Sequence, residues 1–301
     1  MSNRTGSAFA PNFYLFQANA AALSLRLRRP HEVMYTEGSA CLMGIGGVAE
    51  AECHTLFRLH GGILGADSYS TEVTGDFVDR KAAAKMTDSH PPSVSTWETN
   101  RLAITTTTQC KVTGFHSMNF ESAARLDGPT VRIGQLEFRM EGSNSRKDGE
   151  ELAIRFKRLS FSSVFINGQE LKVSVKPAIF DHGPTFASFK KQFESAAFRK
   201  EYGHMVYRPA GSDDSKLYDR RGFCTATVVN KIEWKNPKAA DPNIVIDGHS
   251  IKVPGYGTIY LGEITIAPIQ RRLHMVRVEL GCPDGGSGGG GLGCLGGHEA
   301  P

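Results

Sequence analysis

The feature of this sequence that most constrains its fold is an alternation of apolar and polar residues with a period of two. Leu23, Leu25 and Leu27 fall on one side of an extended chain, and the residues between them fall on the other. Similar runs, rich in β-branched residues, follow in AEAECHTLFRLH, LAITTTTQCKV, VRIGQLEFRM, ELAIRFKRLSFSSVFI, LKVSV, FCTATVVNKIEW, NIVI and residues 258–280. The sequence therefore predicts a mainly β fold, an antiparallel sandwich or barrel, with a bulge at Gly134.

Two segments, INGQELKV at 166–173 and IDGHSIKV at 246–253, share one pattern. In each, Asn-Gly or Asp-Gly predicts the two positive φ angles of a type I′ hairpin turn. Convergent turn chemistry explains the likeness, because tight hairpins favour these residues. The alternative is a duplicated unit, which would favour two related sheets.

One segment, at about 182–203, breaks the β pattern and predicts an amphipathic helix inserted in the β domain. Thr185 can cap its start, and Gly203 can end it after Tyr202. Apolar residues recur at helical spacing: Phe186, Phe189, Phe193 and Ala197. We expect this stripe to pack on a sheet and residues 204–222 to form a polar loop; DRKAAAKM at 79–86 is a second, shorter helix candidate.

The composition changes at Gly281, beyond which glycine is by far the commonest residue, at 9 of the 20 positions of 282–301. We therefore expect a β-rich globular domain at 1–281 and a flexible, disordered Gly-rich tail at 282–301. Two β subdomains that divide near residue 180 are the alternative organisation.

The balance of charge gives little support to a dedicated nucleic-acid-binding protein. Lysine and arginine number 35 against 31 acidic residues, a net charge of +4, and the acids lie among the bases. The isoelectric point of 8.7 is below that of a dedicated basic domain, and no RNP-like string is present. The chain also contains no run approaching the roughly 18 apolar residues of a membrane span and no clear signal peptide, so the expected location is cytoplasmic by default.

The six cysteines are Cys41, Cys53, Cys110, Cys224, Cys282 and Cys294. No two are close enough in sequence to form a CxxC metal knuckle, and a chain of this length does not need disulfides to fold. Buried reduced thiols are therefore the favoured interpretation. Pairing after export remains the alternative for Cys53 with Cys110 and for Cys282 with Cys294.

Two short motif matches lack the structural context that their chemistry requires. GIGGVA at 44–49 fits a dinucleotide-binding pattern, but the alternating residues after it predict a strand where a helix is needed. GGSGG at 285–289 fits a nucleophile elbow around Ser287, but its flanking glycines supply no rigid strand and helix. Neither match predicts a nucleotide site or a nucleophile.

Metal ligands are also not expected at the histidines. His54 and His60 would share a strand face but lie roughly 20 Å apart at 3.3 Å per residue. Cys53 beside His54, and Asp181 beside His182, complete no recognised ligand set. The sequence predicts no metal site and no cofactor.

The most informative polar positions are in residues 258–280, which read as two antiparallel strands. A two-residue turn at Pro268 and Ile269 would place Glu263 directly opposite His274. Each would stand in an otherwise apolar row, and a partly buried acid and imidazole can shift each other's pKa values and act as acid and base. A structural pair that fixes the strand register, or a longer turn that separates the two residues, is the alternative.

These patterns favour a non-catalytic binding protein or a self-assembling structural protein. Its expected partners are a second copy of itself, another protein or a small ligand. A small-molecule enzyme with Glu263 and His274 as its acid–base pair is the alternative function.

Overall fold

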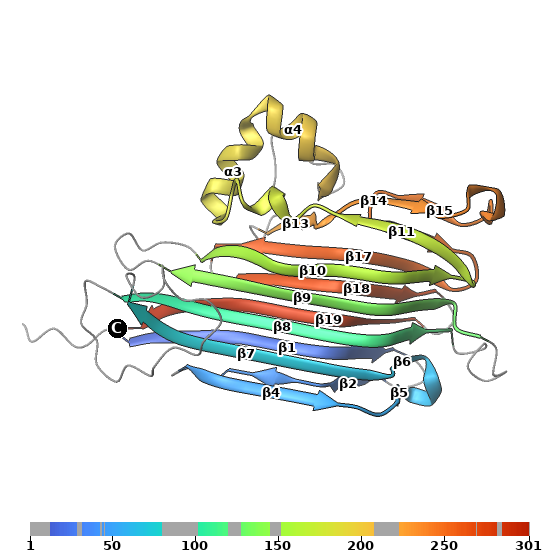
Figure 1. The fold of residues 1–301 in the computed structure, drawn as a ribbon, viewed down its shortest axis with the longest axis horizontal. Helices are drawn as coiled ribbons and strands as arrows, with labels where there is room; N and C mark the ends of the chain where they lie inside the picture. Colours follow the sequence, from blue (N-terminus) through green and yellow to red (C-terminus); the bar gives the residue numbers. More distant parts are fainter. Residues whose placement is uncertain are drawn as a thin grey trace, which may run out of the picture.

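The computed structural model describes residues 13–28, 32–42, 44, 46–79, 102–119, 128–144, 152–207, 223–268, 270–281 and 285–300. The described chain is mainly β, with two antiparallel sheets and few helices (Figure 1). This confirms the predicted mainly β, antiparallel class.

The first sheet, called sheet A, contains ten strands. They are β1 (Phe13–Leu27), β2 (Val33–Glu37), β3 (Ala40–Cys41), β12 (Val206–Tyr207), β13 (Cys224–Thr227), β15 (Val245–Asp247), β16 (Ser250–Val253), β17 (Gly257–Ala267), β18 (Gln270–Leu280) and β19 (Gly286–Ala300). Their main order is β12-β13-β17-β18-β19-β1-β2; β16 also pairs with β17 and β15, and β3 pairs with β1.

The second sheet, called sheet B, contains nine strands. They are β4 (Gly47–Cys53), β5 (Phe57–Leu59), β6 (Leu64–Ala66), β7 (Ser68–Asp79), β8 (Leu102–Ser117), β9 (Val131–Asn144), β10 (Ala153–Ile166), β11 (Gln169–Val175) and β14 (Val229–Trp234). The main order is β14-β11-β10-β9-β8-β6-β5, and β7 joins β8 to β4. Both sheets take strands from before and after residue 180.

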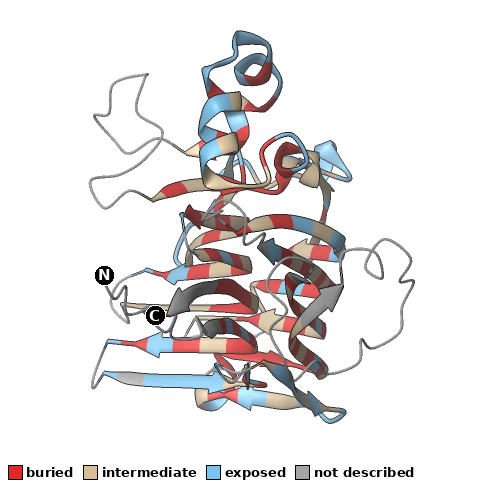
Figure 2. Cartoon of the chain, turned by 90° about the vertical axis from the view of Figure 1, so that its left-hand side faces the viewer, coloured by how far each residue is buried: buried red, intermediate tan, exposed pale blue. Residues whose placement is uncertain are grey.

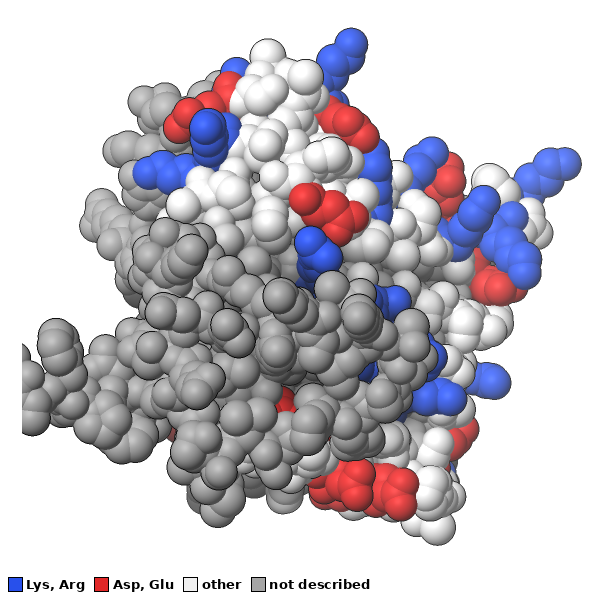
Figure 3. Space-filling model, turned by 60° about the vertical axis from the view of Figure 1, so that its left-hand side comes forward, with Lys and Arg blue, Asp and Glu red and all other residues white. Residues whose placement is uncertain are grey.

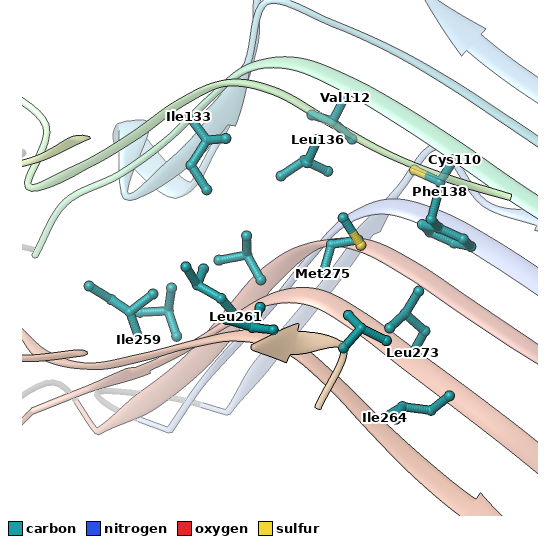
Figure 4. Close-up of a cluster of buried hydrophobic side chains, with 14 of the residues drawn as sticks. Cys110, Val112, Ile133, Leu136, Phe138, Ile259, Leu261, Ile264, Leu273 and Met275 are labelled. Carbon is teal, nitrogen blue, oxygen red and sulfur yellow. The ribbon is translucent and has the colours of Figure 1, made fainter. Parts of the chain in front are cut away.

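One hydrophobic core lies where the inner faces of the two sheets meet. Val112, Leu136 and Phe138 of sheet B point toward Leu273 and Met275 of sheet A (Figure 4). All five side chains are buried, and Figure 2 shows buried residues running along the strands of both sheets. Burial of these apolar side chains removes them from water and is the main source of folding free energy.

The glycine-rich end of the chain differs from the flexible tail that its composition predicts. Residues 286–300 form β19, which lies between β18 and β1 in the middle of sheet A (Figure 1). Its register extends from Leu27 opposite Gly286 to Phe13 opposite Ala300 on β1, and it pairs with β18 along the other side. The prediction from composition is wrong because the neighbouring strands supply backbone hydrogen bonds, and these order a segment that has few side chains of its own.

Close packing of the facing sheet explains why so many residues of β19 are glycine. A Cβ atom added at Gly290 would lie 2.8 Å from the Phe115 ring, and one at Gly293 would lie 2.5 Å from the Phe138 ring. These contacts are shorter than van der Waals separation. Aromatic side chains of sheet B thus fill the space that side chains of β19 would otherwise occupy.

The predicted helix forms as two shorter helices, α3 (Phe186–Glu194) and α4 (Ala196–Tyr202). Thr185 caps α3 through a reciprocal pair of hydrogen bonds with Ser188, as the cap prediction required. Ser195 caps α4, and this break shifts the helical register by one residue. Ala197 is therefore exposed and Phe198 is buried in its place.

The aromatic stripe of these helices packs on the core, as the sequence predicts. Phe189 and Phe193 are buried, and the Phe189 ring stacks on Phe180, 5.7 Å between centroids. Phe180 belongs to a 3-10 helix at Pro177–Phe180 and also contacts Phe156 of β10. Two further 3-10 helices occupy His60–Gly62 and Pro237–Ala239.

The expected polar loop at 204–222 begins with ordered structure. A 3-10 helix at Gly203–Met205 leads into β12, which pairs with β13. The rest of that loop, the short helix candidate around residues 80–86 and Cys282 lie outside the described residues.

The two similar hairpins close on different residues. In the β10–β11 turn, Asn167 and Gly168 both have positive φ, as predicted for a type I′ turn. In the β15–β16 turn, Asp247 pairs with Ser250, so the turn residues are Gly248 and His249, and only Gly248 has positive φ. The prediction of an Asp-Gly turn is wrong there by one residue, with the result that His249 occupies the turn.

Two further local predictions are wrong. The single strand expected over AEAECHTLFRLH is interrupted, because β4 ends at Cys53 and β5 begins at Phe57. The bulge expected at Gly134 is absent: pairing of β9 with β8 and β10 passes over this residue, but the register is the same on either side of it. The partners it passes over, Gly114 and Ser163, both have positive φ.

Candidate ligand-binding site

Four neighbouring strands of sheet A share an irregularity, called here the kink row. Its members are Ala22 of β1, Gly291 of β19, Met275 of β18 and Gly262 of β17. The register of paired residues passes over each of them, and Gly262 and Gly291 have positive φ. Glycine adopts positive φ without steric strain because it has no Cβ atom, which explains why two strands carry glycine at this level of the sheet.

The kink row changes which side chains face outward. On β18, Leu273 and Met275 are buried before the kink, whereas Val276 and Val278 are buried after it. As a result, His274 and Arg277 both lie on the outer face, although a regular strand would send residues three apart to opposite faces.

The predicted pairing of Glu263 with His274 is present in the register of β17 and β18. Strand β17 ends at Ala267 and β18 begins at Gln270, as a two-residue turn requires. The predicted apolar surroundings are wrong, however. Because of the kink, Glu263 and His274 lie on the outer face, away from the buried row that contains Leu261 and Val276.

The strongest contact of the Glu263 carboxylate is with Arg277. The guanidinium donates a hydrogen bond from Nη2 to Oε2 over 2.8 Å, and His249 Nε2 lies 3.6 Å from the same oxygen. Burial acts to raise the pKa of Glu263, but His249 and Arg277 outweigh it and hold that pKa at about 2. Glu263 is therefore ionised at neutral pH.

Aromatic rings hold the groups around this carboxylate in place. The His249 ring is buried and lies 4.1 Å from the Tyr207 ring and 5.6 Å from the Tyr260 ring, between centroids. The Arg277 guanidinium lies 3.9 Å above the Tyr260 ring, a cation–π distance. Arg277 also pairs with the Glu279 carboxylate.

His274 is in a different electrostatic state from the acid–base partner that the sequence suggested. Burial lowers its pKa, Arg272 lowers it further, and these effects outweigh Glu263 to set the pKa at about 4. His274 is therefore neutral at neutral pH. No hydrogen bond joins its ring to Glu263 among the described contacts.

A pocket of about 340 Å³ opens on the outer face of sheet A beside His274. Backbone of β1 and β19 forms its floor, including Gly288 and Gly293. One wall carries Arg272, His274 and Arg277 of β18. The opposite wall comes from β2, β3 and the turn between them and includes Met34, Tyr35, Thr36, Ser39 and Cys41.

The part of the pocket floor that β19 supplies combines the side chains of Ser287 and Leu292 with the backbone of Gly288 and Gly293. At Gly289, next to the pocket, an added Cβ would lie 2.2 Å from the Val276 carbonyl oxygen.

The pocket carries an excess of positive groups. None of its described lining residues is Asp or Glu, and three are arginine. Arg26 pairs with Glu32, and Arg277 pairs with Glu263 and Glu279. No ion pair involves Arg272 within the described part of the chain.

A second hollow, of about 620 Å³, lies on sheet B. It is lined by Arg58, His116 and Arg132, but also by Asp67. The Asp67 carboxylate lies over Gly114, where an added Cβ would be 2.0 Å from Oδ2. An internal carboxylate thus offsets part of the positive charge of this hollow, and neither predicted site residue lies in it.

The described residues contain no group of three or more His, Cys, Asp and Glu side chains placed to hold a metal ion. Their five cysteines, at 41, 53, 110, 224 and 294, are free thiols. Cys294 is buried beside the pocket floor and accepts a hydrogen bond from Gln270. No helix within these residues has the length and hydropathy to cross a membrane.

Acidic and basic side chains lie interspersed over the described surface visible in Figure 3. The three arginines of the pocket come from β1 and β18. Sequence reasoning did not select Arg272, Arg277 or His249. The one signal for Arg277 was Gly262 inside the strand-like run 258–280, since such a glycine marks irregular pairing.

Comparison of the chain with protein-family models, with curated proteins and with solved structures finds no match.

Proposed function

We propose that this protein is a non-catalytic binding protein that holds a small molecule in the pocket over β19. The observation that carries the proposal is the pocket itself: about 340 Å³, floored by glycine backbone and walled by residues from β2, β3 and β18. This volume is within the range of roughly 300–1,000 Å³ found for small-molecule sites. Apolar groups such as Met34 and polar groups such as Ser24 and Thr36 share its lining, a mixture typical of ligand pockets.

The protonation states of Glu263 and His274 favour binding over acid–base catalysis. A general acid or base works best when its pKa is near the working pH. The pKa of Glu263 is about 2 and that of His274 about 4, so both are far from neutrality. These values give little support to the alternative in which Glu263 and His274 act as an acid–base pair.

Self-assembly is the second candidate function, with another copy of the chain as the partner. Strand β2 is at an edge of sheet A, and its Met34 side chain is 71% exposed. Strand β4 pairs with β7 alone, and its Val48 is 55% exposed. Edge strands with exposed apolar residues can pair with another chain. Light scattering after size-exclusion chromatography tests this: assembly should weaken in Met34→Glu, and a wild-type monomer at all concentrations would contradict it.

The binding proposal is tested by filling the pocket. Ser24 lines it from β1, so Ser24→Trp should occupy its volume. Thr258→Trp is a matched control, because Thr258 is on the outer face of β17 in the same sheet but outside the pocket lining. A small-molecule library is screened by ligand-observed NMR. Compounds that bind the wild type should also bind Thr258→Trp but should no longer bind Ser24→Trp. Hits that bind all three proteins equally would contradict the proposal.

A further inference from the structure

We propose that the ligand of the β19 pocket is a small organic anion whose charged group binds Arg272 beside His274. This inference rests on the proposed binding function and adds the chemical class of the ligand. It depends on the distribution of charge among the pocket residues and on the apolar groups that surround them.

Two of the three pocket arginines are already neutralised by the protein. The Arg26 guanidinium pairs with the Glu32 carboxylate at the outer end of the pocket. Arg277 pairs with both Glu263 and Glu279 and lies against Tyr260, so its position is fixed. Carboxylates of the protein therefore neutralise most of the positive charge of these two arginines in the absence of a ligand.

Arg272 is the exception. In the strand register it lies between Cys294 of β19 and Thr265 of β17, both uncharged. Its side chain is exposed into the pocket, and no carboxylate pairs with it among the described residues. A guanidinium offers several N–H donors in one plane, which suits a carboxylate, sulfonate or phosphate group.

The electrostatic state of His274 supports an uncompensated positive charge at this place. The charged groups that face His274 are Arg272 and Arg277 on its own strand and Glu263 on β17; Leu292 faces it from β19. Arg272 lowers the pKa of His274 despite the nearby carboxylate. A bound anion beside Arg272 would therefore raise that pKa and favour proton uptake by His274.

The apolar residues of the pocket lining favour an organic anion, which has an apolar part, and not an inorganic ion. Leu292 and Ala21 lie on the floor, level with His274 in the strand register and close to Arg272. A ligand with an acidic group at Arg272 and an apolar body over Leu292 and Ala21 uses both features.

The test compares two dyes that differ in one charged group: anilinonaphthalene sulfonate, an anion, and the uncharged N-phenylnaphthylamine. Fluorescence titration should show tighter binding of the anionic dye to the wild type. Arg272→Gln should weaken the anionic dye by about 10- to 100-fold, the value of a hydrogen bond to a charged group. The uncharged dye should change little. Arg155→Gln, at an exposed arginine of β10 outside the pocket, is the control and should leave both dyes unaffected.

The outcomes separate this inference from the binding function on which it rests. Suppose that both dyes bind the wild type with equal affinity, fail to bind Ser24→Trp and bind Arg272→Gln as tightly as the wild type. The pocket then binds ligands, but the anionic class is wrong. If Ser24→Trp retains both dyes at wild-type affinity, the binding function at this pocket fails and the inference fails with it. A second readout is the NMR titration of His274: its pKa should rise when the anionic dye is bound, and an unchanged pKa would overturn the placement of the charge.

Discussion

Glu263 and His274 are directly opposite each other on β17 and β18, yet the Glu263 carboxylate accepts its 2.8 Å hydrogen bond from Arg277. The kink row produces this arrangement by bringing His274 and Arg277 to the same face. One consequence is that Glu263 holds a positive group in the pocket wall, while His274 remains neutral beside it.

The Glu263–Arg277 contact should make the protein sensitive to loss of the carboxylate. In Glu263→Gln, Arg277 and His249 lose the charge that faces them, and the free energy of unfolding at pH 7 should fall by about 1.5–3 kcal/mol. Glu279→Gln is the control, since that carboxylate also pairs with Arg277 but is about half exposed, at 49%. Urea unfolding measures both variants; an equal loss in the two would contradict a special role for Glu263.

The same carboxylate should contribute to stability in acid. Its pKa in the folded protein is about 2, below the ordinary 4.5, so its contribution is complete above pH 4.5 and is lost as the pH falls toward 2. The stability difference between wild type and Glu263→Gln should therefore shrink across that interval. Unfolding midpoints at several pH values measure it, and a constant difference down to pH 2 would show that the carboxylate is not held ionised.

His274 should make the protein less stable at mildly acidic pH. Its pKa is about 4 in the folded protein and ordinarily 6.5, so protonation favours the unfolded chain as the pH falls from 6.5 to 4. Wild type should lose up to about 3 kcal/mol more than His274→Gln over that interval. Parallel pH profiles would contradict the lowered pKa. An effect of His274→Gln confined to stability would also rule out a catalytic role for this residue.

The close packing of β19 should make its glycines intolerant of even a methyl group. Gly293→Ala places a Cβ 2.5 Å from the Phe138 ring and should lower the free energy of unfolding by about 1–3 kcal/mol. Gly203→Ala, where an added Cβ meets nothing within 4 Å, should cause no loss. Phe138→Leu combined with Gly293→Ala should recover part of the stability, because a smaller side chain relieves the contact. Additive effects of the two substitutions would argue against direct contact.

The kink row can be tested separately at Gly262. Its φ is +62°, and an added Cβ would lie 2.5 Å from Val228. Gly255 has a similar φ of +73° but nothing near its Cβ position, so Gly255→Ala measures the backbone strain alone. Gly262→Ala should lose more stability than Gly255→Ala. Equal losses would mean that the kink does not pack against Val228.

Much of the fold could be predicted from local patterns. Alternation found the long strands, Thr185 marked the start of α3, and residues 258–280 gave the correct opposition of Glu263 and His274. Each of these depends on neighbours in sequence or on a two-residue turn. Local chemistry is sufficient in such cases.

Other parts depend on contacts between distant segments. The order of β19 comes from β1 and β18 and from the rings of Phe115 and Phe138, none of which can be deduced from a glycine-rich sequence. The outer position of Arg277 requires the kink row, which crosses four strands. The Ser195 break between α3 and α4 moved one buried position from Ala197 to Phe198, a shift that helical spacing alone does not predict.

The glycine-rich end of the chain forms an ordered central strand of sheet A and part of the floor of the pocket. Amide hydrogen exchange of residues 287–295, followed by NMR in the full-length protein, tests it most directly. The structure predicts slow exchange for their paired amides, comparable to that of β18, because β19 has a hydrogen-bonded neighbour on each side. Exchange at the rate of an unstructured chain in residues 287–295, with β18 still protected, would contradict the claim.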